Sequence, residues 1–328
     1  MFVFLAACVG STGSAQHSPI PRTPGSLGDT WTGDGASWRQ HKVAGPARRY
    51  LAALAYDAAR HDYVLFGGQT TQGTSDETWT FDGATWTRIT TEHKPPPRRD
   101  AAMAYDPAHR VVVLYGGLIP DQSEGLEADD TWTWNGVDWS QMIEHSKAPG
   151  PRDGPRMITA GNRVVLFGGR IGNISYFGDT WTWDGEAWLR VDRSPTPDGR
   201  ADAAVVWDPR DSSIFVYGGS GMRPGGGPGE TGVPLSDAWT FRGSDWSQIK
   251  AGGPSPLTVA NAIWDARTDS AIVIFGIRCP SPSNDGWAWD GTKWSHTAIG
   301  VPARWGAGVA QDADGNILVF GGSDQPGC

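Results

Sequence analysis

The chain has 328 residues, of which 38% are hydrophobic and 19% charged, so a disordered chain is excluded and two average domains or one long repeat array are expected. A net charge of −9 argues against nucleic acid and against an anionic membrane surface as the main partner. No apolar run approaches the roughly 18 residues that a membrane-spanning helix needs.

Residues 1–28 indicate a leader followed by a tether. Residues 2–9 are apolar, without a preceding basic region, and Leu5-Ala-Ala-Cys8 resembles a bacterial lipobox, in which the cysteine is lipidated after cleavage. The Ser/Pro/Gly-rich stretch from Ser11 to Leu27 predicts a flexible tether. We therefore expect an extracytoplasmic protein (periplasmic, cell-surface or secreted) and name Cys8 as the candidate for lipidation. The alternative is a wrongly assigned start followed by an unstructured leader.

A ten-residue string recurs six times from residue 29 onward. Its pattern is close to D-x-W-T-x-x-G-x-x-W, and the copies occupy residues 29–38, 77–86, 130–139, 179–188, 237–246 and 285–294. Fifteen of the 18 tryptophans lie inside these copies, so they belong to a repeated architecture.

Each copy predicts a β-hairpin. In Trp132-Thr133-Trp134 the aromatic residues alternate with period two, so both rings lie on one face of a strand. An Asp-Gly or Asn-Gly pair, such as Asp82-Gly83, supplies the positive φ angles of a tight turn. A tryptophan such as Trp86 then begins the return strand. We name these two strands c and d.

A second hairpin family alternates with the first. It joins apolar runs such as Ala52–Asp57 and Tyr63–Gly68, and its second strand ends in Gly-Gly in five of the six units. In the remaining unit, Ile274-Phe-Gly-Ile277, we expect Ile277 to replace the second glycine. Continuous apolar runs are typical of strands buried on both faces. With these strands named a and b, the repeating unit is four antiparallel strands in the order a-b-c-d.

This unit resembles the kelch repeat of bacterial members of the galactose oxidase/kelch-like superfamily. The resemblance rests on the strand that ends in Gly-Gly, the aromatic c strand and the tryptophan that opens strand d, and it covers residues 29–322. It implies an all-β fold, a six-bladed β-propeller of four-stranded antiparallel blades. Kelch units are about 50 residues long, as these are.

The two ends of the array are half-units. The array begins with a c-d hairpin at residues 29–43 and ends with an a-b hairpin at residues 304–322, so five complete blades lie between them. We expect the two halves to pair into the closing blade, because that leaves no long unpaired sheet edge. Residues 29–328 then form one propeller domain, which we expect to be a monomer.

Two cysteines remain after Cys8. Cys279 follows strand b of the fifth complete blade, and Cys328 follows strand b of the closing blade, on the same face of neighbouring blades. They are candidates for a disulfide, which fits an oxidising compartment. Two free thiols are the alternative.

In propellers the d-to-a and b-to-c connections share one face around the central channel, and by analogy we take this loop face as the default site. Aligning the a strands places five arginines in register, with Leu257 in the sixth unit: Arg49, Arg98, Arg152, Arg200 and Arg304. Recurrence favours a structural role, such as hydrogen bonds to carbonyls between blades. The alternative is a ring of guanidiniums that binds a carboxylate or an acidic peptide.

The next position in each unit is irregular and holds Tyr50, Arg99, Asp153, Ala201, Thr258 and Trp305. A residue that breaks a repeat is free to serve a ligand, so Tyr50, Arg99, Asp153 and Trp305 are our first candidates for ligand binding. Asp100 and Asp202 adjoin this position and are added as candidate acids. A concave pocket shared by Arg99, Asp153 and Trp305 would favour a glycan or sugar-active site, and a flat rim of mixed charge would favour a protein partner.

The b-to-c connections vary in length and add three candidates. Residues 170–178 hold Arg170 and Tyr176, and the longest connection, residues 220–236, holds Arg223. Insertions on one face of a repeat protein often form its binding face. The glycine-rich segment after Arg223 lacks Gly-Lys-Ser/Thr and is therefore no phosphate-binding P-loop.

Catalytic and metal signals are weak. No Cys/His cluster has the spacing of a zinc site. The segment Asp312-Ala-Asp-Gly-Asn316 lacks the later glutamate of a calcium loop. The copper site of the galactose oxidase group needs two histidines and two tyrosines, one of them crosslinked to a cysteine, and the residues here do not supply it. We expect no metal and no cofactor.

The leading hypothesis is an exported, non-catalytic scaffold that binds a protein or a glycan on its loop face. The alternative is a carbohydrate-active enzyme resembling the sialic-acid epimerase (mutarotase) group of kelch propellers. There, arginines would hold the substrate carboxylate, and Asp100, Asp153, Asp202 or a histidine would transfer protons. A third reading is a structural surface protein with no specific ligand.

Overall fold

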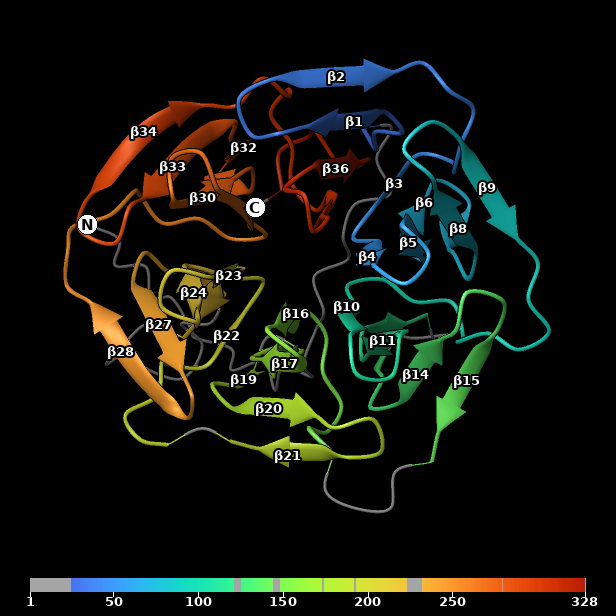
Figure 1. Ribbon diagram of the computed structural model, residues 1–328, viewed down its shortest axis with the longest axis horizontal. Coiled ribbons are helices and arrows are strands. Elements are labelled where there is room, and N and C mark those ends of the chain that lie inside the picture. The colour runs from blue at the N-terminus through green and yellow to red at the C-terminus, as the bar shows by residue number, and fades with distance from the viewer. Residues whose placement is uncertain are drawn as a thin grey trace, which may run out of the picture.

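The computed structural model describes residues 25–120, 125–143, 148–172, 174–191, 193–222, 232–278 and 280–327. Within these ranges every regular element is a β-strand, so the predicted all-β class is confirmed. The same ranges contain no helix long and apolar enough to cross a bilayer. Six four-stranded antiparallel sheets are arranged in a ring, which Figure 1 shows face-on. We number them I to VI and give their strands in the order a to d.

Sheets I to III come first in the sequence. Sheet I comprises β4 (Ala53–Asp57), β5 (Asp62–Phe66), β8 (Thr78–Phe81) and β9 (Trp86–Ile89). Sheet II comprises β10 (Ala102–Asp106), β11 (Val111–Tyr115), β14 (Thr131–Trp134) and β15 (Trp139–Met142). Sheet III comprises β16 (Arg156–Ala160), β17 (Arg163–Phe167), β20 (Thr180–Trp183) and β21 (Trp188–Arg190).

Sheets IV to VI complete the ring. Sheet IV comprises β23 (Ala204–Asp208), β24 (Ser213–Tyr217), β27 (Ala238–Arg242) and β28 (Asp245–Ile249). Sheet V comprises β29 (Asn261–Asp265), β30 (Ser270–Ile274), β33 (Asp285–Trp289) and β34 (Trp294–Ala298). Sheet VI comprises β35 (Gly308–Gln311), β36 (Ile317–Phe320), β1 (Thr30–Gly33) and β2 (Trp38–His41).

Sheet VI joins the first and last strands of the described chain. Strand β1 pairs antiparallel with β36, so that Thr30 lies opposite Phe320 and Gly33 opposite Ile317. The a strands of successive sheets contact one another, from β4 through β10, β16, β23 and β29 to β35, and β35 contacts β4 in turn. The head and tail segments therefore share one sheet, and the a strands form the inner wall of the ring.

The c-d turns have the chemistry that the sequence predicts. The Asp82 carboxylate accepts the backbone N–H groups of Ala84 and Thr85, at 2.8 and 2.7 Å, and Gly83 has a φ of 94°. The aspartate thus fixes the turn through its side chain, while the glycine takes the left-handed conformation that other residues resist.

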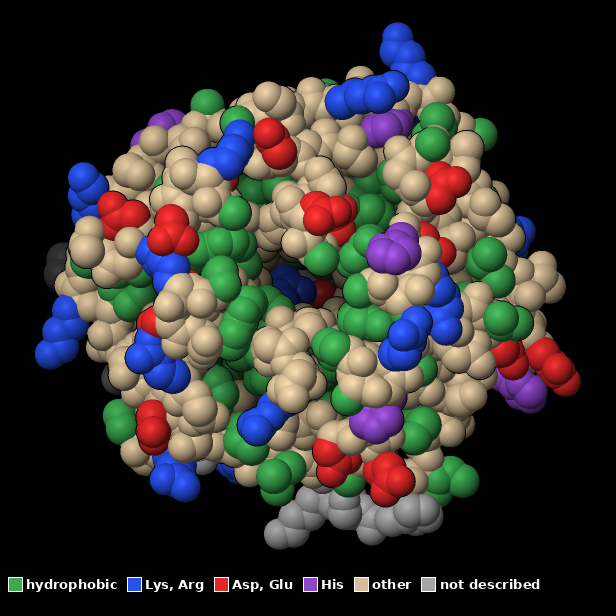
Figure 2. Space-filling model, viewed as in Figure 1, with side chains coloured by type: hydrophobic (Ala, Val, Ile, Leu, Met, Phe, Trp, Pro, Cys, Tyr) green, Lys and Arg blue, Asp and Glu red, His purple; other side chains and the backbone are tan. Residues whose placement is uncertain are grey.

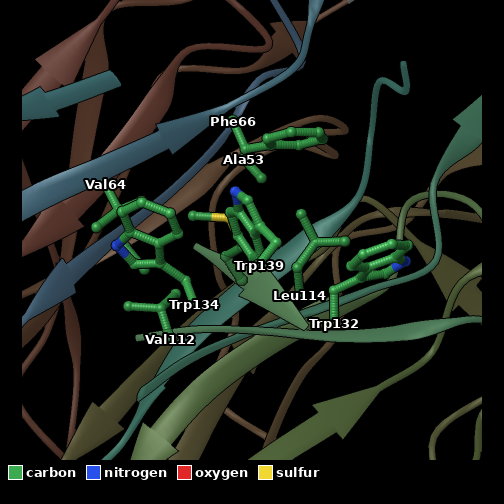
Figure 3. Close-up of a cluster of buried hydrophobic side chains, with 10 residues drawn as sticks. Ala53, Val64, Phe66, Val112, Leu114, Trp132, Trp134 and Trp139 are labelled. Atoms are coloured by element: carbon green, nitrogen blue, oxygen red, sulfur yellow. The ribbon is translucent and has the colours of Figure 1, made fainter. Parts of the chain in front are cut away.

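The core consists of apolar clusters between neighbouring sheets. Figure 3 shows the cluster between sheets I and II, where Trp134 and Trp139 pack with Phe66 and Leu114. The Trp139 ring lies 5.3 Å from the Phe66 ring and 5.4 Å from the Trp134 ring, measured between centroids. Both tryptophans are at most 1% exposed, so the repeated aromatic residues hold adjacent sheets together.

The tryptophan that opens strand d also hydrogen-bonds the preceding sheet. Its indole N–H donates to a threonine hydroxyl at 2.9 to 3.1 Å in four sheets, in the pairs Trp86–Thr30, Trp139–Thr78, Trp188–Thr131 and Trp246–Thr180. Ala238 and Gly286 occupy the threonine position in sheets IV and V. The indoles that follow, Trp294 and Trp38, have no hydrogen-bond partner among the described residues.

Five short ladders extend the connections at the loop face. They are β3 (Arg49–Tyr50) with β6 (Gln69–Thr70) and β7 (Gly73–Thr74), β12 (Leu118–Ile119) with β13 (Leu126–Glu127), β18 (Arg170–Ile171) with β19 (Ser175–Tyr176), β22 (Arg200–Ala201) with β25 (Ser220–Gly221) and β26 (Val233–Pro234), and β31 (Ile277–Arg278) with β32 (Ser281–Pro282). These ladders anchor the b-to-c connections that surround the centre of the face.

Candidate functional site

The five repeated arginines are buried, and their side chains bond within their own sheet. Each is at most 1% exposed, and its Nη1 donates to the carbonyl of the first glycine after strand b at 2.8 to 3.1 Å. Each also pairs with the carboxylate that precedes strand c: Arg49 with Glu77, Arg98 with Asp130, Arg152 with Asp179, Arg200 with Asp237 and Arg304 with Asp29. These guanidiniums already have protein partners and form no exposed ring for an acidic ligand.

We expected these arginines to bond carbonyls between blades, and the structure corrects that expectation. The Arg98 side chain bonds Gly116 and Asp130 of its own sheet II, whereas its backbone makes the bonds to sheet I. The Arg98 N–H donates to the Ser75 carbonyl at 3.2 Å, and the Arg98 carbonyl accepts from the Gly68 N–H at 2.9 Å. The link between sheets therefore depends on backbone geometry.

The carboxylate in this arrangement has two donors. Asp130 accepts from Arg98 and from the Trp132 indole, which is 2.6 Å away. Burial raises the pKa of Asp130, but the bonds from Arg98 and Trp132 outweigh it and hold the pKa below its usual value. The D-x-W motif therefore supplies both the acceptor and one donor of a buried polar cluster.

Sheet V departs from this pattern in two linked places. Leu257 replaces the arginine, and Asp285, which has no such partner, pairs with Arg278 at 3.0 Å. Strand β30 ends at Ile274, so Phe275 takes the place of the first glycine, with a φ of 60°, and Gly276 keeps the second place, with a φ of 96°. Our expectation that Ile277 replaces the second glycine is therefore wrong.

At the centre of the loop face, one position has a left-handed backbone in all six sheets. It holds Leu51, Asp100, Gly154, Asp202, Val259 and Gly306, with φ between 52° and 62°. Backbone hydrogen bonds of 2.7 to 3.0 Å run from sheet to sheet along it, from Leu51 to Gly306, from Asp100 to Leu51, from Gly154 to Asp100 and from Asp202 to Gly154. This series brings acidic side chains from successive sheets together.

Arg170 joins three of the candidate acids into one cluster, which we call the charged centre. Its Nη1 lies 2.7 Å from Asp202, and its Nη2 lies 3.1 Å from Asp153 and 3.5 Å from Asp100. Arg156 on strand β16 adds a second guanidinium, 3.3 Å from Asp202. The three aspartates are only 2 to 5% exposed, so this cluster lies beneath the surface.

The charged centre favours the protonated form of Asp100. Burial, together with the charges of Asp202 and Asp153, raises the pKa of Asp100 to about 8. With Asp100 protonated, two carboxylates remain opposite the guanidiniums of Arg170 and Arg156. The cluster is then electrically neutral, which lowers the cost of burying it.

Tyr50 and Trp305 lie together in an aromatic centre, which also contains Leu51 and Ile277. The Tyr50 and Trp305 rings meet edge to face, with centroids 5.1 Å apart, and the Trp305 indole donates to the Gln325 carbonyl at 2.9 Å. Burial raises the pKa of Tyr50. The loop face therefore has two distinct parts, one apolar and one charged.

Arg99, Asp153 and Trp305, whose sharing of one pocket would favour a glycan or sugar-active site, belong to separate contact groups. Asp153 is part of the charged centre, Trp305 packs on Tyr50, and the Arg99 guanidinium lies 3.5 Å from the Gln69 side-chain oxygen. Tyr176 lies opposite Arg170 in the β18–β19 ladder. The candidates Arg223, Cys8, Cys279 and Cys328 lie outside the described residues.

Sequence reasoning missed three exposed apolar side chains on the same face. Leu126, Ile174 and Met222 lie in the b-to-c connections of three consecutive sheets, II, III and IV, with exposed fractions of 62%, 61% and 42%. We call these three residues the loop-face patch. The sequence carries no signal for this group, because single apolar residues in surface connections are common and only the structure shows that these three are exposed on one face.

One group of side chains of metal-binding type occurs within the described ranges, away from the charged centre. It consists of Glu92, His93 and Asp138. The His93 Nδ1 lies 2.7 Å from Asp138, and this bond raises the pKa of His93. The group lies at the surface, and His93 and Asp138 already bond each other, so we assign it no function.

Residues 29–188 match the family described as the KLHDC2/KLHL20/DRC7 kelch-repeats domain. No curated protein sequence matches the chain significantly.

Proposed function

This chain belongs to the kelch-repeat family, and from that premise we propose that it is a scaffold that binds a polypeptide partner on its loop face. Kelch domains commonly bind proteins. The observation that carries the proposal for this chain is the loop-face patch, because exposed apolar side chains on one face are typical of interaction surfaces.

We also infer that the six sheets are the blades of one closed toroid. Sheets I to V each contain four strands in sequence order, and sheet VI combines β35 and β36 with β1 and β2. The contacts between neighbouring a strands support this arrangement. A closed toroid gives the b-to-c connections a rigid base, so a partner that binds them loses less free energy to ordering of the loops.

The loop-face patch fits a polypeptide better than a glycan. Leu126, Ile174 and Met222 offer aliphatic or thioether side chains, whereas a glycan site needs closely spaced polar groups. Arg99 adds a partly exposed cation beside the charged centre. A partner segment with apolar anchors and a nearby acceptor for Arg99 matches this surface.

The sugar-active alternative requires an acid that touches substrate. Asp100, Asp153 and Asp202 are nearly buried and paired with Arg170. Their position disfavours that alternative.

The test is selection of peptides from a displayed random library against the full chain, followed by affinity measurement on variants. The triple variant Leu126→Ser, Ile174→Ser, Met222→Ser should weaken binding of the selected peptides at least about tenfold, since burying each apolar side chain contributes on the order of 1 kcal/mol or more. Its matched control is Val43→Ser, Val137→Ser, Leu189→Ser, which removes three exposed apolar side chains outside the loop-face patch, with exposed fractions of 39%, 74% and 63%.

The control should bind like the wild type. Failure to select any peptide, or equal binding by the two triple variants, would contradict the proposal. Export and lipidation at Cys8 rest on residues 1–28, most of which lie outside the described ranges, and they stay predictions from the sequence.

A further inference from the structure

The face opposite the loop face opens into a funnel at the centre of the ring. The a-b turns surround its mouth, and Figure 2 shows a central hollow with hydrophobic walls and charged side chains at its bottom. The wide part has a volume of about 750 Å³ and continues into a narrower part of about 120 Å³, and both are lined by Leu54, Met103 and Val205. The wide part is lined mostly by apolar atoms, and its size falls within the range of small-molecule sites.

Aromatic residues form the upper wall of the funnel. The fourth residue of strand a is Tyr56, Tyr105, Trp207 and Trp264 in four sheets, and Thr159 and Gln311 in the other two. All of these line the wide part of the cavity. Four aromatic side chains at equivalent positions around one opening can contact a flat ligand from several sides.

The two exceptions hold the aromatic residues in place. The Thr159 hydroxyl donates to the Tyr105 carbonyl at 2.6 Å. The Gln311 carboxamide accepts from the Trp264 N–H at 2.9 Å and donates to the Trp264 carbonyl at 2.7 Å. The upper wall is therefore formed before any ligand arrives, which reduces the entropic cost of binding.

Two polar residues break the symmetry of the narrow part. The first residue of strand a is alanine or glycine in four sheets, but Arg156 in β16 and Asn261 in β29, and both line the narrow cavity. The Arg156 Nε donates a hydrogen bond to the Ala203 carbonyl at 2.8 Å, and its Nη2 donates to the Asp202 carboxylate. Its Nη1 and the Asn261 carboxamide make no hydrogen bond within the described residues.

We propose that the funnel binds a neutral, planar aromatic molecule whose hydrogen-bond acceptor, such as a carbonyl, reaches Arg156 and Asn261. The aromatic wall and the aliphatic lower wall match a flat apolar body. The two donors, from sheets III and V, match a single acceptor at its inner end.

Charge favours a neutral ligand over an anion. Asp202 already pairs with Arg156, and Asp312 and Asp314 line the mouth of the funnel. An anion would gain little from the paired guanidinium and would pass two acidic residues. This site is independent of the loop-face partner.

The test is a fluorescence titration of the full chain with Nile red, a neutral planar aromatic dye with one carbonyl. We expect saturable binding of one dye per chain, with a blue-shifted emission. Asn261→Ala should weaken binding about fivefold to tenfold, because it removes one hydrogen bond while placing at this position the residue that three other sheets already have there. The matched control Gln248→Ala, on the exposed outer strand β28, should bind like the wild type.

A second variant fills the cavity. Ala262 lines both parts of the funnel, and its equivalents in the other sheets are larger residues, among them Leu54 and Met103. Ala262→Phe should therefore abolish dye binding and leave the fold intact, as circular dichroism would show. If it does not fold, Asn261→Ala still decides the matter.

Four results would overturn the proposal. The first is absence of saturable dye binding, and the second is equal affinity in the wild type and Asn261→Ala. The third is tighter binding of the anionic dye 1-anilinonaphthalene-8-sulfonate than of Nile red. If the loop-face triple variant loses the dye while Ala262→Phe retains it, the dye binds the loop-face patch; the funnel proposal then fails and the proposed function survives.

Discussion

Arg304 holds Asp29 in a two-pronged ion pair, with N···O distances of 2.9 and 3.0 Å, although 275 residues separate them in the sequence. Arg98 and Asp130 make the same arrangement only 32 residues apart. A motif that is local in one sheet thus joins the two ends of the chain in another. The β1–β36 pairing places Asp29 where the repeat requires it.

Removal of Asp29 should destabilise the protein strongly. Asp29→Ala leaves the fully buried Arg304 guanidinium without its counter-charge, and we expect a loss of about 3 kcal/mol, near the lower end of the range for broken buried pairs because the Asp29 side chain is 21% exposed. Urea denaturation measures this change. Asp290→Ala, at an exposed c-d turn, serves as control, and a loss no larger than that of the control would show that Arg304 does not depend on Asp29.

Ala238→Thr should stabilise the protein. In four sheets a threonine at this position accepts a hydrogen bond from the indole N–H of the next sheet. Ala238 of sheet IV offers no such acceptor, and the indole of Trp294 in sheet V has no hydrogen-bond partner among the described residues. A restored bond contributes about 1 kcal/mol, which should appear as a higher urea midpoint. Gly286→Thr should destabilise instead, because a Cβ there would lie 2.7 Å from an Ile299 side-chain carbon. A destabilised Ala238→Thr would mean that packing strain exceeds the gain from the bond.

Phe275→Gly should destabilise the protein even though glycine stands at this position in five sheets. The change relieves a left-handed backbone worth about 1–2 kcal/mol, but it removes a fully buried phenylalanine, which costs about 3–5 kcal/mol. The net loss should be about 2 kcal/mol by thermal or urea denaturation. Unchanged or increased stability would mean that the strain at Phe275 exceeds the value of its packing.

Asp100 should make folding stability fall as the pH rises toward 8. Its pKa is raised from 3.8 to about 8 in the folded state, so the folded protein holds this proton more tightly than the unfolded chain does. The resulting stabilisation is complete below pH 3.8 and is lost as the pH approaches 8, by at most about 1.4 kcal/mol per pH unit.

The comparison is with Asp100→Asn, which copies the protonated form and tolerates a left-handed backbone. Its stability relative to the wild type should increase between pH 5 and pH 8, as measured by urea midpoints. Asp290→Asn should show no such trend, because the pKa of Asp290 is lowered to about 2. Parallel profiles for Asp100→Asn and the wild type would refute the buried proton.

Much of the fold could be predicted because its signals are local. Alternating aromatic residues, Asp-Gly turns and Gly-Gly ends located the hairpins and hence the four-stranded unit. The prediction failed at Phe275. Aligning the glycines by sequence identity placed Gly276 at the first-glycine position, but the strand register assigns that position to Phe275. We also expected the arginine side chains to bond neighbouring blades. Their side-chain hydrogen bonds instead stay within one sheet.

The site could be predicted only in part. The irregular position and its neighbours correctly drew attention to Asp100, Asp153 and Asp202, because symmetry breaking is visible in a sequence. Their shared ion pairs with Arg170 could not be predicted from the sequence, because they join the d-to-a segments of three sheets to one b-to-c ladder. The funnel also escaped notice, because its lining residues alternate with buried ones along ordinary apolar strands.

The sequence by itself determined where the strands and turns lie and that the unit repeats six times, because periodicity and turn chemistry act over a few neighbouring residues. Only the tertiary structure decided which side chains remain available to a ligand. That choice depends on distances between residues tens to hundreds of positions apart. Within the part of the chain that the structure describes, those distances leave the repeated arginines bonded and the aspartates paired. They leave Leu126, Ile174 and Met222 exposed and the Asn261 carboxamide without a hydrogen bond.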